Sequence, residues 1–169
     1  MIRKAKLKDL DEIFNVRLDA KERMKNINID QWQDEEPTKE RFLNDIILKR
    51  AYVMTIEEEI VGIITIQFEP ERSYFKHINN EEKYLTCHRV AIKNGFTQKG
   101  YAINLLKFAE DLALKRKIKK IYIDTHPNNF PMKNLIKKMG YKYLKLISLS
   151  YLRSKKRELH VKFLSLTIV

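Results

Sequence analysis

A strand–helix–strand unit in the middle of the chain constrains the fold more than any other feature. KYLTCHRVAI, residues 83–92, has the apolar and β-branched content of a strand. A polar stretch with two glycines follows, and then a helix-spaced apolar pattern over about 100–116 and a second β-rich run, KKIYIDTH, at 119–126. Because a helix between two strands of one sheet leaves them parallel, this segment predicts a β–α–β crossover.

The rest of the chain predicts antiparallel strands and further helices. Residues 2–6 form a short strand, two helices follow, and a hairpin over 51–68 turns near Glu57–Glu59. Thr38 caps the second helix, and a short helix after residue 127 stops at Gly140. Two strands end the chain. We therefore expect one α/β (α+β) domain over residues 1–169, with a mixed, mostly antiparallel sheet of six to seven strands flanked by four helices.

Composition excludes several classes of protein. The 169 residues are 44% hydrophobic and 33% charged, which is typical of a globular domain. Short apolar runs exclude a transmembrane helix, and the basic N-terminus lacks a signal-peptide pattern, so we expect a cytoplasmic protein without a membrane partner. Cys87 is the only cysteine, which excludes an intrachain disulfide and a cysteine-rich metal site, and we expect no metal.

The net charge of +12 has two interpretations. It could serve a nucleic acid or an anionic ligand, or it could reflect lysines spread over solvated faces. Most lysines alternate with apolar residues on predicted helices, which favours the second interpretation. The tight clusters at Lys115–Lys120 and Arg153–Arg157 could still bind an anion.

The junction GFTQKGYA, residues 95–102, is typical of a pyrophosphate site. A helix start presents N–H groups without partners, and small residues let a phosphate approach them. Gly100 and Ala102 are such residues, Gly95 can make the turn out of the strand, and Lys99 adds a cation. Alternatively, Gly100 only eases a loop into a helix, which the local segment alone favours. Rossmann and Walker A spacings are missing.

A larger pattern changes this weighing. A strand ending at Ile92, an aromatic at Phe96 and the stretch Thr97–Ala102 are followed by Asn129 and by a short helix ending in Gly140–Tyr141. With the N-terminal IRKAKLKDLDEIFNVR, these residues resemble the GNAT acyltransferases, the acetyl-coenzyme A-dependent N-acetyltransferase superfamily. QW before the Pro-Thr helix start, together with HRVAI, resembles a group of small bacterial members.

The resemblance implies an N-acetyltransferase that uses acetyl-coenzyme A (acetyl-CoA) and transfers acetyl to a primary amine directly in a ternary complex. It also implies the cofactor-binding residues. Backbone groups of Val90, Ala91 and Ile92 would hold the pantetheine and polarise the thioester carbonyl. The pyrophosphate and the pantetheine arm would be bound by Thr97, Gln98, Lys99, Gly100, Tyr101, Ala102, Asn129 and Lys133.

Two departures from the family pattern concern the chemistry. Thr97 stands where the family has arginine or glutamine, which would alter the pyrophosphate contact without abolishing it. Ile136 stands where many members have the tyrosine that acts as general acid, so that role passes elsewhere or to solvent. By chemistry alone, Tyr141, Tyr143 and Tyr101 are candidates for the acid, and we take Tyr141 as the catalytic prediction.

His88 is the predicted general base. It precedes Ile92 by four residues, so regular strand alternation places both on one face, together with Tyr84 and Thr86. An imidazole, with its ordinary pKa of about 6.5, suits proton transfer near neutrality. A histidine at this place is similar to the proton-relay histidine of serotonin N-acetyltransferases. A buried structural histidine is an equally good interpretation.

Trp32, Tyr84 and Thr86 are the predicted substrate-binding residues, although Trp32 could instead anchor its loop to the core. The acceptor, a small-molecule or peptide amine, cannot be read from the sequence. Two other functions stay open. The chain could be a degenerate GNAT that binds CoA as a sensor or scaffold. It could also be a basic nucleic-acid-binding module, although the sequence contains no recognised RNA-binding motif. Dimers are frequent in the superfamily, and we would look for a homodimer surface near the apolar end FLSLTIV.

Overall fold

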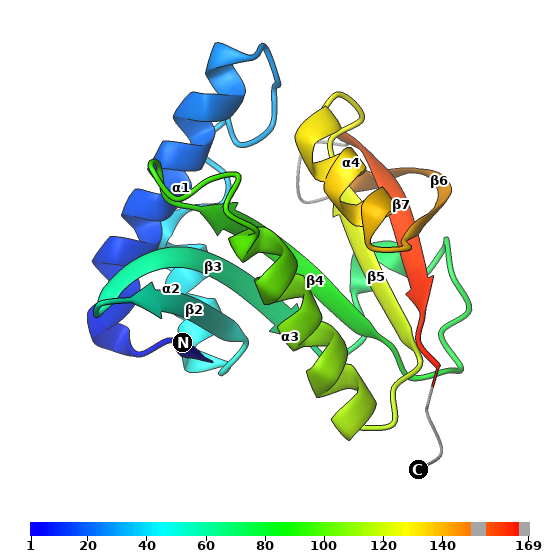
Figure 1. Ribbon diagram of the computed structural model, residues 1–169. Coiled ribbons are helices and arrows are strands. Elements are labelled where there is room, and N and C mark those ends of the chain that lie inside the picture. Colours follow the sequence, from blue (N-terminus) through cyan, green and yellow to red (C-terminus); the bar gives the residue numbers. More distant parts are fainter. Residues whose placement is uncertain (150–154, 166–169) are drawn as a thin grey trace. The chain divides into compact units, whose positions relative to one another are not determined.

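The computed structural model describes residues 1–149 and 155–165. Their strands form a seven-stranded sheet in the order β1-β2-β3-β4-β5-β7-β6 (Figure 1). The strands are β1 Ile2–Lys4, β2 Ala51–Ile56, β3 Glu59–Gln67, β4 Leu85–Ile92, β5 Lys120–Thr125, β6 Lys142–Leu149 and β7 Lys155–Phe163. The helices are α1 Leu10–Asn26, α2 Lys39–Ile47, α3 Tyr101–Lys115 and α4 Phe130–Lys138, with 3-10 turns η1 Leu7–Asp9 and η2 Arg72–Tyr74.

The strand pairings confirm the predicted fold class. β1, β2 and β3 pair antiparallel in sequence, and β7 pairs antiparallel with both β5 and β6. β4 and β5 are parallel, as the predicted crossover requires. The chain forms two compact units, and their boundaries cut through β4 and α3. The first unit is Met1–Ile66 with His88–Phe108, and the second is Gln67–Cys87 with Ala109–Val169.

The first unit has helices on both faces of its strands (Figure 1). Ile13 of α1 and Phe42 of α2 pack against Val53 of β2 in one buried cluster. On the α3 face, a Cβ added to Gly62 would lie 2.9 Å from the Cδ1 atom of Ile92 and 3.2 Å from that of Leu105. Only glycine therefore lets α3 approach β3 this closely.

Local turn and cap predictions are confirmed. The β2–β3 hairpin turns through Glu57 and Glu58, whose φ values of 47° and 70° are those of a tight two-residue turn. The Thr38 hydroxyl accepts a hydrogen bond from the Arg41 N–H at 3.2 Å and so caps α2. Gly140, with φ of 87°, follows α4 and ends it in the left-handed region.

The second unit has an aromatic core on one face of β5 and β7. Tyr74, Tyr84 and Tyr122 are buried there, and the rings of Tyr84 and Tyr122 meet edge-to-face with centroids 5.2 Å apart. The Tyr84 hydroxyl accepts a hydrogen bond from the Glu71 N–H at 2.9 Å, so it fixes the loop before η2. The sequence also predicts a basic turn at Ser154–Arg157, but Lys155–Arg157 already belong to β7. Ser154 and the last four residues of FLSLTIV lie outside the described residues.

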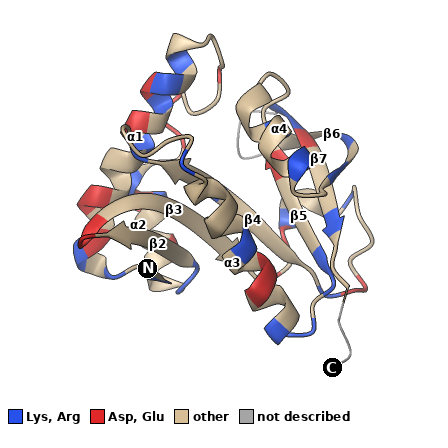
Figure 2. Ribbon diagram, in the orientation of Figure 1, with Lys and Arg blue, Asp and Glu red and all other residues tan. Residues whose placement is uncertain are grey.

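Lysines and arginines are spread over helices, strands and loops (Figure 2). Several of them pair with carboxylates, such as Lys162 with Glu110 at 2.7 Å and Lys120 with Glu82 at 2.7 Å. Among the described residues, no helix combines the length and the apolar character needed to cross a bilayer.

Candidate functional site

The backbone of β4 turns left-handed at Arg89, inside the strand, and from this we infer a β-bulge there. The φ of 52° at Arg89 lies in the left-handed region, where a side chain other than that of glycine costs roughly 1–2 kcal/mol. A bulge adds one residue to a strand and shifts the alternation of faces beyond it. The premise that His88 shares a face with Ile92 is therefore wrong. His88 instead shares a face with Ala91, whose side chain belongs to the core cluster under α1 and α2.

The loop after β4 has the backbone conformation of an anion cradle. Gly95, Gln98 and Gly100 have φ of 80°, 61° and 81°. The first helical hydrogen bond of α3 runs from the Asn104 N–H to the Gly100 carbonyl, at 3.1 Å. The N–H groups of residues 101–103 precede that bond and so have no intrahelical acceptor.

The residue at the start of this helix has room for a larger group. A Cβ added to Gly100 would meet no heavy atom within 4 Å. Lys99 lies beside the cradle, with its Nζ atom 5.1 Å from the centroid of the Phe96 ring. N–H groups without intrahelical acceptors, a helix N-terminus, a glycine with room beside it and a lysine together suit a diphosphate.

Helix α1 holds the entry to this loop. The Arg23 guanidinium donates to the Ile92 carbonyl at 2.6 Å and also to the Asn94 side-chain oxygen. Asp19 accepts a hydrogen bond from the Asn94 N–H at 2.8 Å. Sequence reasoning missed this clamp, because its partners lie 69 to 75 residues apart and share no motif. The Ile92 carbonyl therefore already accepts a hydrogen bond from Arg23. Val90, on the same strand, is half-buried.

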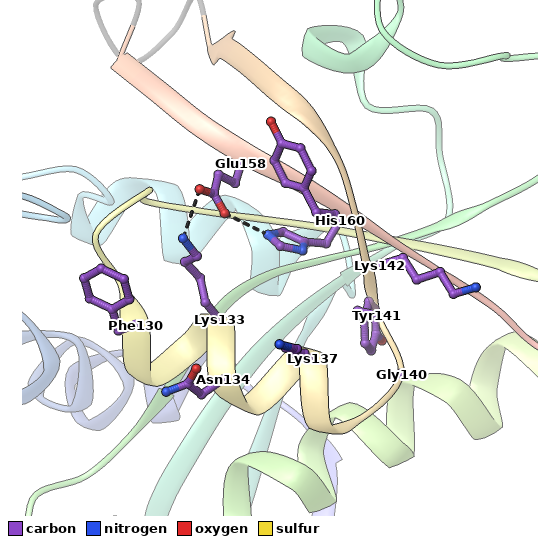
Figure 3. Close-up of a pocket in the computed structure, with 10 residues that line it drawn as sticks. Phe130, Lys133, Asn134, Lys137, Gly140, Tyr141, Lys142, Glu158 and His160 are labelled. Carbon is purple, nitrogen blue, oxygen red and sulfur yellow. Dashed lines mark hydrogen bonds and ion pairs between the residues drawn. The ribbon is translucent and has the colours of Figure 1, made fainter.

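In the second unit, a groove of about 810 Å³ lies between α4 and the strands β6 and β7 (Figure 3). Lys133 donates to the Pro127 carbonyl and to Glu158 Oε1, both at 3.0 Å, and the other Glu158 oxygen lies 3.4 Å from His160 Nε2. The groove is lined by Phe130, Lys133, Asn134, Lys137, Gly140, Tyr141, Lys142, Tyr143, Glu158 and His160. Lys133 is therefore bound within the protein, and its predicted phosphate contact would have to compete with Glu158.

Asn129 also has a structural role. Its side-chain oxygen accepts a hydrogen bond from the Met132 N–H at 3.1 Å and caps α4. Only its amide N–H₂ group can donate to a ligand, so the predicted contact with the pantetheine arm would use those hydrogens.

His160 makes stability depend on pH. Burial lowers the pKa of His160, and nearby Glu158 opposes this shift without cancelling it. The unfolded chain therefore binds more protons than the folded one below about pH 6.5, and the free energy of unfolding falls as the pH drops through this range. We expect His160→Gln to flatten this dependence by at most about 1.4 kcal/mol per pH unit. Urea unfolding of both proteins from about pH 7.5 to 5 tests it; parallel curves would contradict it.

Comparison with known families decides which kind of protein carries this cradle. The model of the acetyltransferase (GNAT) family matches residues 12–141. The chain belongs to the GNAT acetyltransferase family. This confirms the resemblance found in the sequence, and with it the cofactor, because acetyl-CoA is the acetyl donor of this family.

Solved structures agree with the GNAT assignment. A GNAT-family acetyltransferase from Streptococcus agalactiae is 25% identical, with a TM-score of 0.84 over 98% of this chain and 95% of that one. One from Listeria monocytogenes is 18% identical, with a TM-score of 0.79 over 97% and 94%. The PaiA N-acetyltransferase of Thermoplasma acidophilum, solved with coenzyme A, is 21% identical, with a TM-score of 0.72 over 97% and 98%. The last two show the fold alone. No curated protein matches the sequence.

The position of the GNAT general acid carries no hydroxyl, because Ile136 occupies it, as the sequence indicates. Ile136 is fully buried, and Tyr141 is only 3% exposed. Burial raises the pKa of Tyr141 far above the ordinary tyrosine range, and its hydroxyl has no hydrogen-bond partner within the described residues. These properties argue against Tyr141 as a proton donor, although its role stays a prediction.

The three predicted substrate-binding side chains are buried. Trp32 is 9% exposed and packs in the core of the first unit, while its carbonyl accepts a hydrogen bond from Arg17 at 3.1 Å. Tyr84 and Thr86 are buried in the second unit. The structure thus places Trp32 as an anchor of its loop, which was the alternative interpretation. Cys87 is also buried, which raises the pKa of its thiol and suits a core residue.

Proposed function

We propose that this GNAT chain, acting as one domain over residues 1–169, is an acetyl-CoA-dependent N-acetyltransferase. It transfers acetyl to a primary amine of a small molecule or peptide by direct attack in a ternary complex. The observation that carries the proposal is the cradle at the start of α3, where the N–H groups of residues 101–103 have no intrahelical acceptor and a Cβ added to Gly100 would meet no heavy atom within 4 Å. The fold neighbour PaiA, solved with coenzyme A, supports the same ligand class.

When bound, acetyl-CoA supplies the acetyl group as a thioester. The residues of the chain bind and orient it. The backbone of Thr97–Ala102 donates hydrogen bonds to the pyrophosphate, and the dipole of α3 favours its negative charge. The backbone of β4 at Val90 and Ala91 holds the pantetheine and donates toward the developing oxyanion. Both segments belong to the first unit, and Arg23 links them by holding Ile92 and Asn94.

His88 removes the proton from the attacking ammonium. It is half-buried, and an extra residue at Arg89 would place it on the same face of the strand as Ala91. The core cluster of that face includes Trp32, so the loop over residues 26–37 lies on the same side of the first unit. In GNAT enzymes this loop covers the acceptor site. A His88 side chain on the face of Ala91 would therefore lie on the acceptor side of the strand, which supports His88 as the base better than the face of Ile92 does.

The thiolate leaving group takes its proton from solvent rather than from Tyr141. We expect Tyr141→Phe to keep turnover within about twofold, because the lost hydroxyl is buried and donates to no group among residues 1–149 and 155–165. Removing a buried hydroxyl without a partner should also leave the thermal midpoint unchanged or higher. Steady-state rates and thermal unfolding measure both effects. A tenfold loss of kcat with an unchanged fold would restore Tyr141 as the acid.

An acceptor screen tests the proposed function. Thiol release from acetyl-CoA is followed with a panel of polyamines, amino acids, aminoglycosides and peptides, beside calorimetry with CoA. Release that depends on one amine class supports the enzyme. CoA binding without release across the panel favours a sensor or scaffold. Absence of CoA binding, with a salt-sensitive gel shift, would favour the nucleic-acid module.

A further inference from the structure

A buried polar cluster in the first unit joins α2, β3 and the bulge of β4. Arg89 donates from Nε to Asp45 Oδ2 at 2.7 Å and from Nη2 to Asp45 Oδ1 at 2.9 Å. Thr65 of β3 also donates its hydroxyl to Asp45 Oδ2, at 3.0 Å. The Asp45 side chain is 3% exposed and that of Arg89 is 14% exposed. A two-pronged pair of this kind fixes the guanidinium in position and in plane.

The residue that makes this pair is also the residue with the unusual backbone. The left-handed φ of 52° at Arg89 would suit glycine, and a glycine there would carry no strain. The strain of an arginine in this conformation has to be offset by favourable contacts of its side chain. The pair with Asp45 supplies such contacts and ties the bulge to α2 and β3 at a defined point.

The bulge separates the two parts of the proposed machinery on β4. His88, the proposed base, comes directly before Arg89, and the backbone of Val90 and Ala91, which is proposed to hold the thioester, comes directly after it. A bulge that relaxed, or moved by one residue, would turn His88 to the opposite face of the strand. It would also redirect the N–H and carbonyl groups that follow it.

We propose that Arg89 is a positioning residue for acetyl transfer, and that Asp45 and Thr65 hold it so that the bulge stays in register. This inference rests on the proposed function, because it concerns the same strand. The pyrophosphate cradle is held separately, by Arg23 and Asp19 on α1. Loss of the Arg89 anchor should therefore disturb the chemistry on β4 much more than the binding of CoA at the cradle.

The test uses variants of the full chain that break the pair in different ways. Asp45→Asn keeps the shape and removes the charge, and Arg89→Lys keeps the charge and loses the fork. Because a buried charge without its partner can unfold a protein, the double variant Asp45→Leu/Arg89→Met replaces the pair by apolar groups of similar size. Asp9→Asn is the matched control, since Asp9 forms a similar two-pronged pair with Arg3, at 2.6 and 3.0 Å, away from β4.

We expect each folded variant of the pair to lose about 10- to 100-fold in kcat, as small misplacements of reacting groups do, while KM for acetyl-CoA changes by less than about threefold. Asp9→Asn should lose stability and keep its kcat. A variant of the pair that is destabilised but turns over normally in its folded fraction would reduce the pair to a structural role and overturn the inference. So would equal losses in kcat and in CoA affinity.

A second measurement does not depend on turnover. Amide NMR spectra with added CoA should show shifts at Val90 and Ala91 and at the cradle in the natural protein. In the variants of the pair, the shifts at Gly100 and Tyr101 should persist while those at Val90 and Ala91 differ from the shifts in the natural protein. If the natural protein acetylates no amine, the proposed catalysis fails, and this pattern alone decides the inference. Unchanged shifts at Val90 and Ala91 would overturn it.

Discussion

His88→Ala is expected to slow turnover by about 10²- to 10⁴-fold, the range that a positioned general base contributes. The affinity for CoA should change by less than about threefold, because the cradle at α3 lies beyond the bulge and is held by α1. Steady-state kinetics and calorimetry with CoA measure the two quantities separately.

His77→Ala is the matched control for this change. His77 is also half-buried, but it belongs to the loop after η2 in the second unit. His77→Ala should leave both kcat and the affinity for CoA unchanged. If His88→Ala turned over at the natural rate, His88 would be a structural residue, and the base would have to be solvent or another group. A higher KM for the amine with kcat unchanged would mean that His88 orients the acceptor instead.

The order of helices and strands could be predicted because its signals are local. Apolar residues recur with the period of a helix or a strand, and Thr38 and Gly140 mark ends by their own chemistry. The cradle could be predicted for the same reason, since Gly95 and Gly100 have the positive φ that glycine permits.

The bulge at Arg89 could not be predicted, because an arginine gives no local sign of a left-handed backbone. The conformation is accompanied by contacts with Asp45, 44 residues away, and with Thr65, 24 residues away. The face of His88 was wrong for this reason alone. Burial of Trp32 and Tyr141 likewise follows from tertiary packing, which the residue types do not specify.

Gly100→Asp is expected to weaken CoA binding by about 100-fold, the second large effect. Aspartate tolerates a positive φ better than most residues, so the loop should keep its form. Its carboxylate would project into the open space where Gly100 has no neighbour within 4 Å, and would repel a pyrophosphate there. Calorimetry with CoA measures the loss, which should shrink as salt screens the charges.

Two controls separate charge from shape and position. Gly100→Asn has the size of aspartate without the charge, so it should lose much less affinity than Gly100→Asp. Gly95→Asp places the same charge at the other end of the cradle loop, away from the start of α3, where the backbone is also left-handed with φ of 80°, so it should weaken CoA binding less than Gly100→Asp does. If Gly100→Asp bound CoA with the same affinity as Gly100→Asn, no anion would lie at this helix start. Since the cradle is the observation on which the acetyltransferase proposal depends, the position of the cofactor and the role of His88 would then both have to be sought elsewhere in the chain.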